Sequence, residues 1–205
     1  MKLFQVFFFL INGFCSFGQD KNLIQHKKHF DQELKQWTKS FSNFKLSDFK
    51  VEDTLHFENN FQQDFNSYKK FLSVYKPIIT YSVDSSKFID IYSYQINLEK
   101  KGNYYQANTD IDQIVLLCDF KKKYWNRIYF GTTSQWIDEV VWVSKTQFVL
   151  VGIIKSEDDK KNPVILFGDI TKQTLIKYLS VDKNSLQKDN GYSSFKLKRI
   201  PIKGL

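Results

Sequence analysis

The chain has 205 residues and a formal net charge of +8, and this length is enough for one domain with a substantial core. Every basic residue except Arg127 and Arg199 is a lysine. Because arginine is the residue that reads phosphates and base edges through paired hydrogen bonds, this composition argues against a nucleic-acid-binding protein.

Residues 1–18 have the pattern of a secretory signal peptide. Lys2 supplies a positive charge, Leu3–Ile11 is mostly apolar, and the small residues Ser16 and Gly18 stand where a cleavage site requires them. The apolar run is shorter than the roughly 20 residues that span a bilayer. The pattern therefore predicts a cleaved signal, with an uncleaved anchor as one alternative.

Cleavage between Gly18 and Gln19 would place the mature chain outside the cytoplasm, either in the periplasm or as a secreted protein. No transmembrane span is expected after the signal is removed. Lipid attachment at Cys15 is a further alternative, although Phe14 precedes this cysteine where a small residue is expected. The mature chain would keep only Cys118, within an apolar run, which predicts a buried and unreactive thiol and no disulfide.

Residues 19–77 are predicted to form a helical cap. Within Lys21–Phe41 the apolar residues recur at helical spacing, and these are Phe30, Leu34, Trp37 and Phe41. A second helix is predicted from Asn60, as the N-cap, to Tyr75. Between the two helices, alternation over Phe49–Glu58 predicts a half-buried strand.

Residues 78–205 are predicted to form an antiparallel β domain, in one compact unit with the cap. Turn residues separate many of the strand-like runs, and some runs are apolar on both faces, which is typical of strands inside stacked layers. The runs are Ile78–Val83, Phe88–Leu98, Ile111–Phe120, Trp125–Thr132, Ile137–Ser144, Gln147–Lys155, Pro163–Ile170, Thr174–Ser180 and Tyr192–Ile200.

A weak internal repeat runs through this region. Residues 79–93 and 140–152 share a pattern, and each is followed by an apolar strand ending in Asp119 or Asp169, a lysine-containing turn and another apolar strand. Over residues 78–180 this arrangement resembles two blades of a β-propeller, each of four antiparallel strands. A propeller ring takes at least about four blades, so two units favour packed sheets instead.

The predicted fold class is therefore mainly β with N-terminal helices, an α+β protein. Its β part is expected to be an antiparallel two-layer sheet or sandwich, or a pair of propeller-blade-like repeats, capped by the two helices.

No catalytic, metal or cofactor motif stands out in the sequence. The glycine-flanked serine elbow, the phosphate-binding loop and the dinucleotide fingerprint are all missing. His26 with His29, and Asp110 with Asp112, have spacings that could place two ligands on one side, but no third ligand follows. We expect these pairs to be solvated surface and turn residues, and we predict no catalytic residue, no metal and no cofactor.

The aromatic residues suggest one candidate site. Tyr104, Tyr105, Trp125 and Trp136 stand at the ends of predicted strands, where aromatic rings are needed less for the core. Exposed rings of this kind stack on sugars or anchor protein partners. We therefore expect these four rings to form an exposed cluster that binds a protein or glycan ligand.

These observations favour a non-catalytic exported binding or inhibitor-like domain. One alternative is an accessory or structural subunit of an envelope assembly. Another is an extracytoplasmic glycan hydrolase, which would require two carboxylates facing each other across a cleft.

Overall fold

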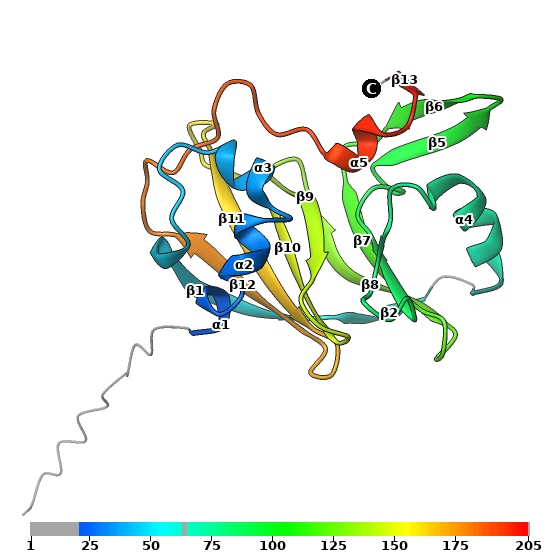
Figure 1. Ribbon diagram of the computed structural model, residues 1–205, viewed down its shortest axis with the longest axis horizontal. Coiled ribbons are helices and arrows are strands. Elements are labelled where there is room, and N and C mark those ends of the chain that lie inside the picture. The colour runs from blue at the N-terminus through cyan, green and yellow to red at the C-terminus, as the bar shows by residue number, and fades with distance from the viewer. Residues whose placement is uncertain (1–20, 63–64, 205) are drawn as a thin grey trace, which may run out of the picture.

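The computed structural model describes residues 21–62 and 65–204 (Figure 1). The predicted signal peptide, the cleavage position between Gly18 and Gln19, and Cys15 lie outside the described residues.

Two five-stranded antiparallel sheets contain most of the strands of the described chain (Figure 1). Their strands are β1 (Phe49–His56), β2 (Glu58–Gln62), β3 (Thr80–Tyr81), β4 (Lys87–Asp90), β7 (Gln113–Asp119), β8 (Tyr124–Gly131), β9 (Gln135–Trp142), β10 (Gln147–Lys155), β11 (Lys161–Asp169) and β12 (Thr174–Ser180). The first sheet has the order β1-β12-β11-β10-β9 and the second the order β2-β8-β7-β4-β3. A small third sheet contains β5 (Ile96–Lys101), β6 (Tyr104–Thr109) and β13 (Ile202–Lys203). The fold is therefore mainly β with antiparallel sheets, as the sequence predicts.

The helix predicted over Lys21–Phe41 is divided into three short helices. These are α1 (Lys21–Ile24), α2 (Lys27–Asp31) and α3 (Lys35–Lys39). The apolar residues at helical spacing are nonetheless buried, and they pack on the first sheet in a cluster with residues of β10 and β11. In Figure 1 these helices lie across one face of that sheet.

The second predicted helix begins later than expected. Asn60 lies in β2 instead of capping a helix, because this segment pairs with β8, where Glu58 lies opposite Arg127. A 3-10 turn (Phe65–Ser67) then leads into α4 (Tyr68–Tyr75). Pairing with a distant strand thus overrides the local capping signal.

Helices are also not confined to the N-terminal part of the chain. The run Tyr192–Ile200, predicted as a strand, contains α5 (Phe195–Lys198). Ser194 caps this helix, since its hydroxyl oxygen accepts a hydrogen bond from the backbone N–H of Lys196 at 3.2 Å.

The strand predicted at Phe49–Glu58 is present as β1, but it is not half-buried. Phe49 is buried, whereas Val51 and the three residues after it are exposed. β1 lies at the edge of its sheet, so its alternation of apolar and polar residues is not matched by alternating burial. A 3-10 turn (Leu46–Asp48) precedes it.

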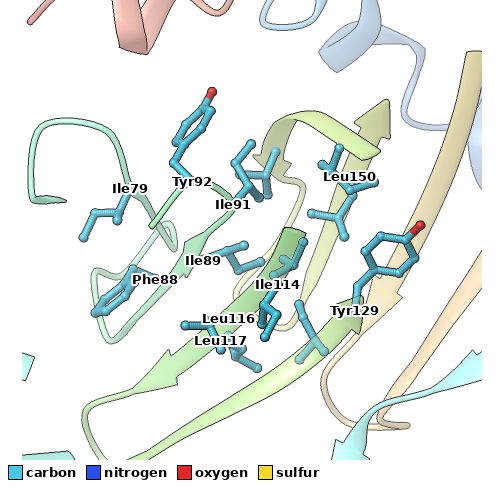
Figure 2. Packing of buried hydrophobic residues seen from close by; sticks show 14 of the residues in the cluster. Ile79, Phe88, Ile89, Ile91, Tyr92, Ile114, Leu116, Leu117, Tyr129 and Leu150 are labelled. Atoms are coloured by element: carbon cyan, nitrogen blue, oxygen red, sulfur yellow. The ribbon is translucent and has the colours of Figure 1, made fainter. Parts of the chain in front are cut away.

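One hydrophobic core joins the two large sheets. Ile89 of β4, Ile114 of β7 and Leu150 of β10 belong to the same buried cluster (Figure 2). Cys118 is fully buried in this cluster, and burial raises the pKa of its thiol to about 12. The prediction that this thiol is buried is confirmed, and the raised pKa leaves little of the reactive thiolate at neutral pH.

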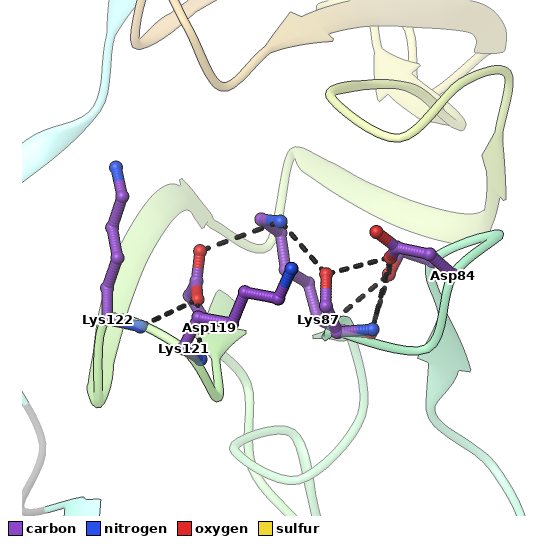
Figure 3. A network of polar contacts seen from close by, with 7 residues as sticks. Asp84, Lys87, Asp119, Lys121 and Lys122 are labelled. Atoms are coloured by element: carbon purple, nitrogen blue, oxygen red, sulfur yellow. Dashed lines mark hydrogen bonds and ion pairs between the residues drawn. The ribbon is translucent and has the colours of Figure 1, made fainter.

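Strand β7 of the second sheet and strand β11 of the first sheet both end in an aspartate that begins the same kind of turn. The Asp119 carboxylate accepts hydrogen bonds from the backbone N–H groups of residues 121 and 122, and Asp169 does the same with residues 171 and 172. Figure 3 shows the first of these turns, with the Lys87 ammonium 3.6 Å from Asp119. Both carboxylates therefore stabilise turns. Two sheets do not form a propeller ring.

Phe148 provides a test of the shared core. It is fully buried on β10 and packs edge to face on Trp142, with ring centroids 5.5 Å apart. Phe148→Ala should lower the free energy of unfolding by about 3–5 kcal/mol, because it leaves a cavity. Urea unfolding followed by tryptophan fluorescence measures this loss.

The matched control is Phe130→Ala, which removes the same phenyl ring from a position where the side chain is 39% exposed. This variant should lower the free energy of unfolding by less than about 1 kcal/mol. Equal losses for both variants would show that the shared core is not where the sheets gain their stability.

Candidate functional site

The candidate site is built on an irregularity in the edge strand β9. Val151 lies opposite Glu139 and Gly152 lies opposite Ile137, so Asp138 is an additional residue in the strand. A Cβ atom at Gly152 would lie 1.9 Å from a facing carbonyl oxygen of β9, so glycine is required there. This β-bulge changes the direction of the side chains beside it, as bulges near functional sites do.

The Glu139 carboxylate is buried and binds the C-terminal segment. It accepts hydrogen bonds from the Tyr192 hydroxyl at 2.9 Å, from the Lys196 ammonium at 2.8 Å and from the Ser194 hydroxyl. The buried Tyr92 hydroxyl donates to Ser194 Oγ at 2.6 Å and extends the network. Burial, and then the nearby negative charge of Glu139, raise the pKa of Tyr92.

The same network reaches the second sheet through Thr80. Lys196 Nζ donates to Thr80 Oγ1 at 2.8 Å, and the Trp142 indole N–H donates to the Thr80 backbone oxygen at 3.0 Å. Because Thr80 begins the edge strand β3 and Trp142 ends the edge strand β9, these bonds join the edges of the two large sheets.

Asp138 has a different environment from its neighbour Glu139. Its carboxylate accepts one indole N–H from Trp37 at 3.1 Å and one from Trp136 at 3.2 Å. Burial raises the pKa of Asp138 to about 7, and the two indole hydrogen bonds oppose that shift. Asp138 therefore ties α3 to β9 and can change its charge near neutral pH.

A groove of about 560 Å³ opens beside this network, between β9, β3 and α5. We call it the β9 groove. Its lining residues are Glu33, Gln36, Thr80, Tyr81, Val83, Glu139, Val140, Val141, Trp142, Tyr192, Phe195 and Lys196. Val83 and Phe195 are 70% and 59% exposed, which is unusual for large apolar side chains, so they offer an open apolar contact. The volume lies within the range of about 300–1,000 Å³ that is typical of ligand pockets.

The four aromatic residues predicted to bind a ligand do not form an exposed cluster. Trp125 is fully buried against Phe71, and Tyr105 is buried in the main core. Tyr104 is half-buried on β6, and Trp136 is half-buried on β9 in the first large sheet. The prediction of an exposed aromatic cluster is therefore wrong, because the rings of Trp125 and Tyr105 are buried in the core. Trp136 alone adjoins the candidate site, through Asp138.

The paired residues considered for metal binding have structural contacts. His29 Nδ1 lies 3.2 Å from a Glu33 carboxylate oxygen, and Asp110 accepts a hydrogen bond from the next backbone N–H at 2.7 Å. Within residues 21–62 and 65–204, no three His, Cys, Asp or Glu side chains converge as a metal site would require. Over the same residues, no helix has both the length and the apolar character needed to cross a membrane.

Asp138, Glu139, Tyr192 and Lys196 are not among the residues predicted from the sequence to form a site. The available signal was the pair of adjacent acids inside the otherwise apolar strand from Trp136 to Trp142. Acids in such a strand need partners. The partners of Glu139 lie more than 50 residues further along the chain, whereas those of Asp138 are Trp136 in the same strand and Trp37 in α3.

Comparisons of the chain with protein-family models, with curated proteins and with solved structures find no match.

The raised pKa of Asp138 predicts a pH-dependent stability. Its carboxyl group has a higher pKa in the folded state than the ordinary value of 3.8, so protonation favours the folded state. The stability that this group contributes should be fully present below about pH 4 and lost as the pH rises to about 7. The loss should amount to a few kcal/mol.

Asp138→Asn isolates this contribution from those of other acids. The free energy of unfolding of this variant, relative to that of the wild type, should increase between pH 5 and pH 8, as measured by urea unfolding at each pH. Asp189→Asn, at an exposed position, is the control and should follow the wild type. Parallel pH curves for Asp138→Asn and the wild type would contradict the assignment.

Proposed function

We propose that this chain is an exported, non-catalytic binding domain that holds an apolar peptide segment of a partner protein in the β9 groove. The observation that supports this most strongly is the combination of two exposed apolar side chains, Val83 and Phe195, with polar groups that are already bonded to one another. Such a groove gains free energy mainly from apolar contact with its ligand.

A peptide ligand is favoured by the position of the groove at two strand edges. β9 and β3 are the last strands of their sheets. An extended peptide can pair with an edge strand through its backbone while its side chains enter adjacent pockets. Val83 and Phe195 are placed to contact apolar side chains of such a peptide.

Binding is favoured over glycoside hydrolysis by the state of the two acids. Glycosidases use two carboxylates on opposite sides of the scissile bond. Here Asp138 and Glu139 are adjacent in the chain, and each is held by protein donors. A glycan ligand is also less favoured, because Trp125 and Tyr105 are buried and their rings are not exposed for stacking on a sugar.

Export is supported by the sequence of residues 1–18. In that location, outside the cytoplasm, the groove would meet peptide segments of envelope or secreted proteins.

A random library of displayed twelve-residue peptides, panned against the purified protein, tests the proposal. Peptides with two or more apolar residues should be enriched. Val83→Asp and Phe195→Asp should each weaken binding of these peptides at least about tenfold, because each introduces a charge at an apolar contact.

Ile111→Asp is the matched control, since Ile111 is 71% exposed and lies outside the groove. Its binding should equal that of the wild type. Selected peptides that bind all three variants equally, or a library that yields no binder, would contradict the proposed function.

A further inference from the structure

A second groove lies on the other side of the N-terminal helices. It has a volume of about 640 Å³ and lies between α2, α3 and the segment 41–47. Lys188, from the C-terminal segment, closes part of it, since its ammonium donates to the Lys39 backbone oxygen at 2.9 Å. We call it the lysine-rimmed groove.

The floor of this groove is aromatic. Phe30, Phe41 and Phe44 line it, and the Phe44 ring centroid lies 6.5 Å from that of Phe30 and 6.2 Å from that of Phe41. Phe44 also packs on the buried rings of Trp37 and Phe49, at 5.5 and 5.3 Å. Phe30 and Phe41 are almost fully buried, so the floor is held in place by the core beneath it. A ligand in this groove would therefore rest on a preformed apolar surface.

The rim carries an excess of positive charge. Lys27, Lys39, Lys45 and Lys188 line the groove, and Asp31 is the one acid among its lining residues. Asp31 is paired with Lys27 at 2.5 Å. The carboxylate therefore offsets Lys27, while the other three ammonium groups remain to attract an anion.

We infer that the lysine-rimmed groove binds a single-chain fatty acid, with its alkyl chain on the aromatic floor and its carboxylate at Lys39 and Lys188. The two parts of the groove match the two parts of this ligand. A free inorganic anion would leave the aromatic floor unused, and a cationic amphiphile would be repelled by the rim.

A single molecule fits the groove better than a bilayer surface does. Among the apolar residues that line it, Ile24 is the one that is largely exposed, at 52%. Insertion into a membrane requires several apolar side chains that project outward. The other apolar lining residues are buried or half-buried.

Titration calorimetry of the purified protein with palmitate, below its micellar concentration, tests the inference. Saturable binding of one palmitate per chain is expected. Hexadecyltrimethylammonium, which has the same chain length and the opposite charge, and acetate, which lacks the chain, should each bind at least about tenfold more weakly.

Two variants test the charged rim and the exposed apolar side chain of the groove. The double variant Lys39→Glu/Lys188→Glu should weaken palmitate binding at least about tenfold, because it reverses the charge at the carboxylate position. Ile24→Asp should also weaken it, and it alters an exposed side chain that folding does not require. Lys100→Glu/Lys121→Glu makes the same charge change at exposed positions outside the groove and should leave binding unchanged.

Three results would overturn the inference. The first is equal binding of palmitate and hexadecyltrimethylammonium. The second is palmitate binding that the Lys39/Lys188 variant does not change. The third is binding to phosphatidylglycerol vesicles with no binding to monomeric palmitate, which would indicate a membrane surface as the ligand.

Discussion

The buried carboxylate of Glu139 is the group on which the arrangement around the β9 groove depends. A carboxylate removed from water costs several kcal/mol unless cations and hydrogen-bond donors surround it. Lys196, Tyr192 and Ser194 supply those donors, and all three belong to the C-terminal segment. Because the charge must keep its partners, this segment is held against β9, and the wall of the groove that it forms is held with it.

The bulge in β9 gives two adjacent acids two different environments. Glu139 has a cation beside it, whereas Asp138 has two indole N–H donors as its hydrogen-bond partners. Burial acts against the charge of Asp138, and the two indole hydrogen bonds oppose only part of that effect. The side chain that links α3 to the first sheet can therefore lose its proton near neutral pH. Gly152 makes this arrangement possible, because a larger residue would collide with the bulged strand.

The sequence predicted the parts of this fold that depend on local periodicity. The helical spacing of Phe30 and Trp37 correctly identified the side of the N-terminal segment that is buried, and the apolar run around Cys118 correctly identified a buried strand. The sequence did not predict β2, because its residues form a strand only by pairing with β8. Trp125 was misjudged for a related reason: its position near a turn suggested exposure, but α4 covers it through Phe71.

The candidate site could not be predicted from the sequence, because it depends on long-range contacts and on strand register. Glu139 and Lys196 are 57 residues apart in the chain, and their contact requires the C-terminal segment to cross the edge of the first sheet. The bulge depends on the register between β9 and β10, which no local pattern encodes. What the sequence did contain was a pair of acids inside an apolar strand, and this feature indicates that buried charges are paired somewhere in the fold.

The most direct test of the account is amide hydrogen exchange in Glu139→Gln, which removes the charge and keeps the shape of the side chain. If Glu139 holds the wall of the groove, the amides of residues 192–199 should exchange faster than in the wild type, while those of β10 and β11 should not change. Glu99→Gln, at an exposed position on β5, is the control and should leave every segment as it is. Unchanged exchange over residues 192–199 in Glu139→Gln would contradict the account.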